Sequence, residues 1–204
     1  MQASESRDPY GAALGAVRQF ADAGRFVPGE PIVVTELAAE VGLSPTPVRE
    51  ALACLAGEGL IERRRGRGYF YPALTASDVI DLFELQLAYL HAALTLHPRG
   101  LAPLRKAVAG IEPHEGVQAV FEAIIAHSSN TALSSAHQRL VHRLGAILRF
   151  ERRTEDPTGA KVAAIKEAVL AGRIPELLGL LERHHEQRCA KPPVLLPTQG
   201  RWRP

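Results

Sequence analysis

Arginine and glycine residues are concentrated in one short stretch of this chain, Arg63-Arg-Arg-Gly-Arg-Gly68. Residues 44–56, just before it, have the spacing of a helix, with Arg49 near the beginning. Guanidinium groups can form paired hydrogen bonds with guanine edges and with phosphates. A helix tip that carries such a group beside a basic loop can read base edges and contact the DNA backbone. These residues therefore predict recognition of double-stranded DNA.

The positive charge of the chain is local. The formal net charge is only +2, from 24 lysines and arginines against 22 aspartates and glutamates. Four of the arginines nevertheless fall between positions 63 and 67. A small basic edge on a nearly neutral molecule favours docking at a specific DNA site over general coating of nucleic acid.

Two predicted helices position the arginines. Thr35 is expected to cap a helix over residues 36–41, and Gly42 is expected to end it. Residues 44–56 form the second helix, whose two early prolines fall in the first turn, where proline is tolerated. Apolar residues recur along this helix at i, i+3, i+4 and i+7: Val48, Ala51, Leu52 and Leu55.

A hairpin follows the second helix. Residues 60–64 and 68–71 have the composition of strands, joined through Arg65-Gly66-Arg67. Glycine is placed where a tight hairpin requires a positive φ angle. The hairpin completes a winged helix-turn-helix over residues 10–72.

The predicted DNA contacts come from the turn, the helix tip and the wing. Thr46 and Arg49 are expected closest to the base edges, and the wing arginines are expected to reach phosphate or the minor groove. The predicted set is Thr35, Ser44, Pro45, Thr46, Pro47, Arg49, Arg65, Gly66 and Arg67. The alternative is a solvated hairpin beside an ordinary core helix. The agreement of turn, helix and wing favours DNA binding.

A family pattern runs through the same residues. It is carried by Pro28-Gly29, Leu37-Ala38, Val41-Gly-Leu-Ser-Pro-Thr-Pro-Val-Arg-Glu-Ala-Leu52, Leu55, Glu58-Gly-Leu60 and Gly68-Tyr-Phe70. These stretches closely resemble the GntR family of bacterial transcription regulators. The resemblance implies a homodimer on a short palindromic operator, with one recognition helix per half-site. Pro45 departs from the family, which often has a DNA-contacting basic residue there, and Thr35 stands where some members have arginine.

The second half of the chain is predicted to be all helical, because helical spacing continues from near Asp78 without strand alternation. The expected fold class is therefore mainly α: a winged helix-turn-helix followed by a helical bundle. The predicted division is a disordered N-terminus (1–9), a DNA-binding domain (10–72), a linker (73–78), a helical effector-binding and dimerisation domain (79–188), and a mobile proline-rich tail (189–204).

The helical half resembles the effector domain of FadR-type GntR regulators, called FCD. The supporting features are the stretch Leu74–Asp78 before a long helix, Phe121 followed by Ser128-Ser-Asn130, and Ala168 to Gly172 before a last helix with His-His. Many members hold a divalent metal through one Asp and three His, and the metal holds a carboxylate effector. Three of these positions fall on Gln118, Glu122 and Val162. Only His184 matches, so the metal site is degenerate.

No cofactor is therefore expected. A divalent ion, if one binds, would have at most Glu122 and His184 as ligands, which is too few for a stable site. Two further family positions, where Arg and Glu are common, fall on Gln86 and Leu90.

A metal-free polar pocket is then the remaining effector site. Its candidate residues are Gln86, Gln118, Glu122, Asn130 and His184. In the alternative interpretation Gln118 and Glu122 are solvated, Asn130 caps a helix, and His184-His185 is exposed. His137 and His142 are interpreted as surface residues, because a spacing of five does not place them on one helix face.

These features predict a sequence-specific regulator, in the first hypothesis a ligand-responsive repressor. The second hypothesis is a DNA-binding dimer with a decayed ligand site, controlled by its abundance or by a protein partner. An enzyme is not expected, because the chain has no activated nucleophile, glycine-rich phosphate loop or ligand triad. Two cysteines without CxxC spacing and no long apolar run predict a cytoplasmic protein without a membrane partner.

Overall fold

A computed structural model describes residues 8–96, 100–154 and 159–192, with the side chains of 153 and 154 excepted. The described residues fall into two compact units, one ending at Leu74 and one beginning at Thr75. The first unit is a small winged helical domain and the second is all helical, which confirms the predicted fold class. The predicted disordered N-terminus and the proline-rich tail lie largely outside the described residues.

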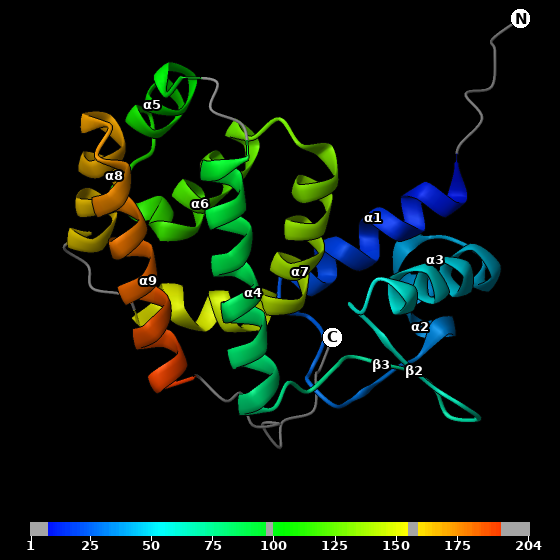
Figure 1. The fold of residues 1–204 in the computed structure, drawn as a ribbon. Helices are drawn as coiled ribbons and strands as arrows, with labels where there is room; N and C mark the ends of the chain where they lie inside the picture. The colour runs from blue at the N-terminus through cyan, green and yellow to red at the C-terminus, as the bar shows by residue number, and fades with distance from the viewer. Residues whose placement is uncertain (1–7, 97–99, 155–158, 193–204) are drawn as a thin grey trace, which may run out of the picture. The chain divides into compact units, whose positions relative to one another are not determined.

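The N-terminal unit contains three helices and a small antiparallel sheet (Figure 1). Its elements are α1 (Pro9–Asp22), β1 (Pro31–Ile32), α2 (Val34–Val41), α3 (Pro45–Gly57), β2 (Glu62–Arg64) and β3 (Gly68–Phe70). In the sheet, β3 lies between β1 and β2. The hairpin of β2 and β3 pairs Arg63 with Tyr69 and Arg64 with Gly68. The order helix, turn, helix, hairpin is the predicted one.

Local sequence explains most of the helix ends. Gly42 ends α2 with a left-handed backbone, φ +67°, and its N–H returns to the carbonyls of Ala38 and Ala39. Thr35 was expected to cap this helix, which is wrong. The helix begins at Val34, so Thr35 already lies in the first turn and Val33 holds the cap position without a side-chain bond. Asp8 caps α1 through Gly11, so residues 8 and 9 are ordered.

The predicted apolar face of α3 forms the core of the N-terminal unit. Its four residues, Val48, Ala51, Leu52 and Leu55, are fully buried. They pack with α1 residues such as Val17 and with Leu37 of α2. Full burial of each leucine stabilises the fold by about 1.5–3 kcal/mol. Because this face points inward, the opposite face of α3 is exposed.

The helical unit consists of α4 (Ala76–Thr95), α5 (Ala102–Ala109), the 3₁₀ turn η1 (Pro113–Glu115), α6 (Gly116–His127), α7 (Thr131–Thr154), α8 (Ala160–Ala171) and α9 (Ile174–Ala190). Thr75 and Asp78 form a capping box at the start of α4, each side chain bonding the other's backbone N–H. Helix α9 reaches Ala190, two residues beyond the predicted end of this domain.

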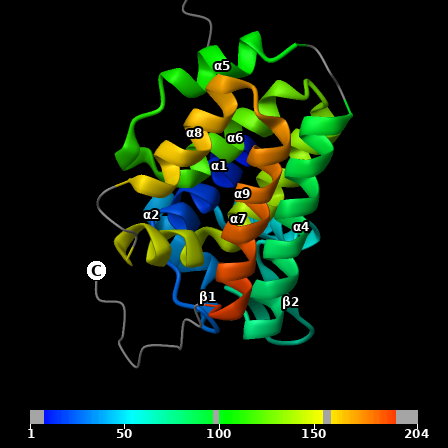
Figure 2. The same cartoon turned by 60° about the vertical axis from the view of Figure 1, so that its left-hand side comes forward.

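Helix α6 is the centre of this unit, because it packs against α4, α5, α7 and α8. Figure 2 shows α4 and α9 running side by side. The apolar core between these helices includes Leu90, Phe121 and Val162, all almost fully buried. None of the helices within the described ranges is both long and apolar enough to cross a membrane.

Candidate functional site

An arginine-lined hollow lies between α3 and the hairpin of the N-terminal unit. Its volume is about 500 Å³. The lining residues are Arg49, Arg63, Arg64, Arg65, Gly66, Gly68 and Tyr69. The hollow is thus built from the exposed side of α3 and one face of the hairpin.

Tyr69 holds the two walls of the hollow together. Its ring is buried, and its hydroxyl donates to the backbone carbonyl of Arg49 at 3.4 Å. Arg63 is paired with Tyr69 across the two strands, and paired residues have their side chains on the same face of a hairpin. Both side chains therefore lie on the face nearer α3. Arg63 and Arg49 therefore line the same hollow.

The other face of the hairpin carries Phe70. The Arg64 guanidinium lies 4.1 Å from the centre of the Phe70 ring, and that of Arg67 lies 5.8 Å away. Arg64 also binds Glu62 through two hydrogen bonds of 2.9 and 2.8 Å. These bonds lower the pKa of the Glu62 carboxyl and raise the pKa of Arg64. Arg64 therefore already has a counter-charge.

Among the described side chains, none supplies such a counter-charge to Arg49, Arg63 or Arg65. Each of the three is exposed, and no carboxylate within the described ranges forms an ion pair with them. Gly66, at the tip of the hairpin, has φ +71°, as a turn of this kind requires. The hollow can therefore offer several unpaired guanidinium groups to an anion.

The structure places the remaining predicted DNA contacts at the surface. Thr35, Ser44, Pro45, Thr46, Arg65, Gly66 and Arg67 are exposed, and Pro47 is half-buried. The hollow brings together Arg49, Arg65 and Gly66 from the predicted set. Arg63 was not in that set. Counting residues across the three-residue turn could have found it, because Arg63 then falls opposite Tyr69.

A chain of polar side chains crosses the helical unit. Gln86 of α4 is fully buried, and its Nε2 donates to Oε1 of Gln118 on α6 at 3.1 Å. Gln118 in turn donates to Oε1 of Glu122 at 3.4 Å. On the other side, Arg188 of α9 donates to Oε1 of Gln86 at 2.8 Å. Three of the predicted effector residues are thus hydrogen-bonded in sequence.

Asn130 does not join this chain. Its Oδ1 accepts from the backbone N–H of Leu133 at 3.0 Å and so caps the start of α7. The structure therefore agrees with the alternative interpretation of Asn130, in which this residue caps a helix. Glu122 is exposed and reaches the chain only through Gln118.

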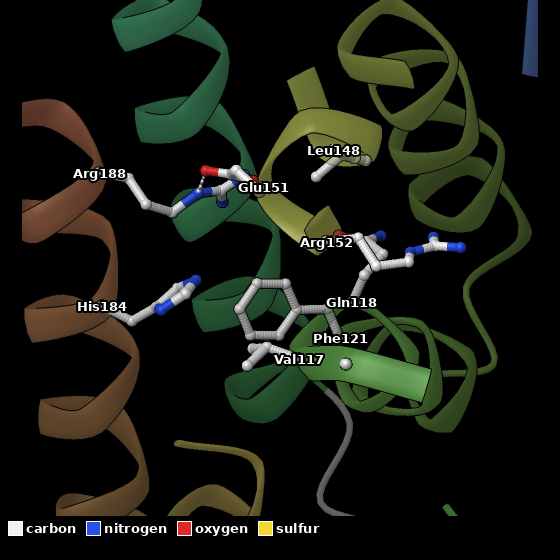
Figure 3. Close-up of a pocket in the computed structure, with 9 residues that line it drawn as sticks. Val117, Gln118, Phe121, Leu148, Glu151, Arg152, His184 and Arg188 are labelled. Carbon is white, nitrogen blue, oxygen red and sulfur yellow. Dashed lines mark hydrogen bonds and ion pairs between the residues drawn. The ribbon is translucent and has the colours of Figure 1, made fainter. Parts of the chain in front are cut away.

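A small cavity of about 30 Å³ lies beside the polar chain (Figure 3). The lining residues are Gly116, Val117, Gln118, Phe121, Leu148, Glu151, Arg152, His184 and Arg188. Arg188 and Glu151 form two hydrogen bonds here, of 2.8 and 2.7 Å. The Arg188 guanidinium also lies 3.6 Å from the centre of the Phe83 ring. Sequence reasoning did not find this ion pair, whose members are 37 positions apart.

Three histidines of the helical unit are held neutral by burial, and one of them, His184, lines the cavity. His184 and His185 both pack on Phe121, with ring centres 5.6 and 5.4 Å from it. Burial, reinforced by the charge of Arg188, lowers the pKa of His184 to about 3. Burial also lowers the pKa values of His185 and His137 to about 4. His137 is only 3% exposed, so the expectation that it lies at the surface is wrong.

The residues of this region do not fit a divalent metal. Val162 and Leu90, onto which the resemblance to FadR-type regulators placed two functional positions, are both part of the apolar core. In the part of the chain that the structure describes, no group of three or more His, Cys, Asp or Glu side chains could hold an ion. The arrangement here instead suits a guanidinium and its anion.

Comparison with known proteins supports the family resemblance. Residues 9–70 match the profile of bacterial regulatory proteins of the gntR family. The Nta operon transcriptional regulator of Aminobacter aminovorans is 41% identical over 71 residues, 35% of this chain and 34% of that protein. The regulator YdhC of Bacillus subtilis is 36% identical over 73 residues, 36% of this chain and 33% of its own length. The chain thus matches about a third of the length of each of these relatives.

Solved structures extend the likeness beyond the N-terminal unit. A GntR transcriptional regulator from Rhodococcus sp. RHA1 has a TM-score of 0.73 at 18% identity, covering 89% of this chain and 96% of that one. McbR/YncC of E. coli has a TM-score of 0.67 at 19% identity, covering 90% and 96%. At these identities the likeness shows a shared fold. The chain is thus similar in sequence to the gntR family of bacterial regulatory proteins over residues 9–70, and similar in fold to solved regulators over about nine tenths of its length.

Proposed function

We propose that this chain is a transcription regulator that binds double-stranded DNA as a homodimer. Helix α3 enters the major groove with Thr46 and Arg49 toward the bases, and the hairpin contacts the backbone. The arginine-lined hollow carries the proposal, since three of its guanidinium groups are exposed and have no carboxylate partner among the described side chains. Exposed, uncompensated cations around a helix tip suit the phosphates and base edges of DNA.

The test uses DNA fragments that the full-length protein selects from genomic DNA. Fluorescence anisotropy then measures affinity for the selected site at several salt concentrations. Arg49→Ala is expected to weaken binding by about 1–3 kcal/mol if it reads a base. Arg105→Ala, an exposed arginine on α5, is the matched control and is expected to leave the affinity unchanged. Equal affinities for Arg49→Ala and the unchanged protein would contradict the role of Arg49.

The homodimer is tested on the same material. Sedimentation equilibrium measures the mass of the free protein, and footprinting measures the spacing of the protected half-sites. Two half-sites about one helical turn apart are expected from a two-fold protein. A monomer that protects a single half-site would contradict the proposal.

We further propose that the helical unit adjusts DNA binding in response to a small molecule. A ligand that prefers one dimer geometry shifts the population toward it and changes the spacing of the recognition helices. The polar chain that ends at the cavity supports this proposal, because Gln118 and Arg188 both line the cavity. Operator affinity with and without a candidate ligand is the measurement.

A second candidate is a DNA-binding dimer whose ligand site has decayed. The cavity favours it, because about 30 Å³ leaves room for only about two water molecules. A thermal-shift screen with divalent metals and small carboxylic acids separates the two. Stabilisation by any of them supports the sensor, and no stabilisation supports control by abundance or by a protein partner.

A further inference from the structure

The N-terminal tip of α3 has few hydrogen-bond donors. The first four N–H positions of a helix have no partner within that helix, and in α3 these are residues 44–47. Two of the four, Pro45 and Pro47, are prolines and have no N–H group. Helix N-termini that bind phosphate do so through these N–H groups. The tip of α3 is therefore poorly suited to an anion.

Carbon atoms stand at the tip where donors are missing. Pro45 and Thr46 are exposed, and Pro47 is half-buried. The pyrrolidine ring of Pro45 and the methyl group of Thr46 are therefore accessible to a partner, and Thr46 also has a hydroxyl group. Val48, the next residue, is fully buried and faces the core. Helix α3 thus begins with a small apolar surface, at the end that the proposed function directs into the major groove.

The cations of this region lie beside the apolar tip. Arg49 is four residues after Pro45, about one helical turn, and lines the arginine-lined hollow together with Arg63 of the hairpin. This hollow can hold the phosphates of a DNA strand that passes between helix and hairpin. Phosphate contacts are then made in the hollow, and the tip of α3 is left to face a base edge.

An apolar surface distinguishes the four bases in the major groove. Thymine presents a C5-methyl group there, whereas guanine and adenine present the N7 acceptor and cytosine presents an amino donor. A proline ring that covers an acceptor or a donor removes its water without replacing the hydrogen bond, which weakens binding. A proline ring that covers a methyl group removes only apolar surface from water, which strengthens binding. The tip of α3 therefore fits thymine better than the other bases.

We propose that Pro45 and Thr46 read the methyl group of one thymine in each half-site of the operator. The Pro45 ring and the Thr46 methyl group pack against the C5-methyl group, and Arg63 holds a neighbouring phosphate. This inference rests on the proposed DNA-binding function and names one base of its target. Loss of the thymine methyl group should lower the affinity by about fourfold per half-site, or about sixteenfold for both, as expected for one buried CH₂ group each.

The experiment uses the full-length protein and the DNA site that it selects from genomic DNA. Each symmetric pair of thymines in the two half-sites is replaced in turn by deoxyuridine, which lacks only the C5-methyl group. Fluorescence anisotropy measures the affinity for each duplex at constant salt. One pair is expected to lower the affinity about sixteenfold, and every other pair by less than about twofold. The proposal is overturned if no pair has this effect, or if the two half-sites share no thymine.

A double variant separates direct contact from an effect of the methyl group on DNA shape. Thr46→Ser removes one methyl group and keeps the hydroxyl, and Pro45→Ala removes the ring. The double variant is expected to bind the thymine and deoxyuridine duplexes with affinities within about twofold of each other. Thr131→Ser, the same change at an exposed position of α7, is the matched control and should keep the full ratio. A double variant that is folded by circular dichroism and keeps the full ratio contradicts the contact.

The same measurements distinguish failure of this inference from failure of the proposed function. Equal, salt-dependent affinities for all of the duplexes reject the thymine contact and leave the DNA-binding function standing. If the protein selects no DNA fragment, the proposed function is rejected and this inference with it.

Discussion

The two units of this protein hold arginine in opposite ways. Arg49, Arg63 and Arg65 of the N-terminal unit are exposed and have no described carboxylate partner. Arg188 of the helical unit is buried and bound by Glu151. Water stabilises an exposed guanidinium until a ligand arrives, whereas a buried one needs an anion at all times. A surface arginine can therefore stay without a counter-charge, while a buried one must be met by an anion of its own chain.

The largest expected effect comes from removing the counter-charge of the buried arginine. Glu151→Ala should lower the free energy of unfolding by about 3 kcal/mol, the lower end of the range for a broken buried pair, because Glu151 is partly exposed. Urea unfolding followed by circular dichroism measures it. Glu62→Ala is the matched control, because it removes the partner of the exposed Arg64 and should cost at most about 1 kcal/mol. Equal losses of stability in the two variants would contradict the expectation that the buried arginine depends more on its carboxylate than the exposed one does.

Lowering the pH should destabilise the helical unit and leave the stability of the N-terminal unit unchanged. All eight histidines lie at or beyond position 91. Burial lowers the pKa of His137 to about 4. Between pH 6.5 and 4, therefore, His137 binds a proton in the unfolded chain but stays neutral in the folded one. The stability from this group is present above pH 6.5 and is lost as the pH falls toward 4, on the order of 2 kcal/mol.

Hydrogen exchange at pH 7.5 and pH 5 locates this loss along the chain. Lower protection factors in α4 to α9 at pH 5, with unchanged protection factors in α3, are the expected pattern. His137→Gln, which cannot titrate, should show a shallower dependence of stability on pH. Uniform loss of protection in both units would contradict the assignment to the buried histidines.

The wing arginines should differ in their effect on DNA affinity. Arg63 lines the hollow beside Arg49, whereas Arg67 lies over Phe70 on the other face of the hairpin. Arg63→Ala should cost about 1 kcal/mol and lower the salt dependence by about one phosphate contact. Arg67→Ala should cost less. A larger loss for Arg67→Ala would move the docking surface to the Phe70 face.

The smallest expected effect concerns the bond between the walls of the hollow. Tyr69→Phe removes only the hydroxyl that donates to the Arg49 carbonyl. We expect a loss of about 0.5–1 kcal/mol in DNA affinity, because the bond is long and Arg49 loses part of its positioning. Retained thermal stability shows that the loss is local. If DNA affinity is unchanged, the hydroxyl does not position Arg49.

Pairing across the three-residue turn, together with the period of the apolar residues, was sufficient to predict the winged helix-turn-helix. Val48, Ala51, Leu52 and Leu55 specify the buried face of α3, and this leaves Arg49 on the exposed face. Gly42 and Gly66 mark points where the backbone must adopt a positive φ. All of these are local constraints, acting over a few residues, and such constraints can be read from the order of residues alone.

The interior of the helical unit was decided by tertiary structure. Arg188 bonds Gln86 from 102 positions away and Glu151 from 37 positions away, and a helical period does not specify which helices face each other. The period also did not show that His137 turns inward, because that depends on how α7 packs. The sequence determined where the cations lie along the chain. Packing decided which of them lost water and therefore required an internal anion.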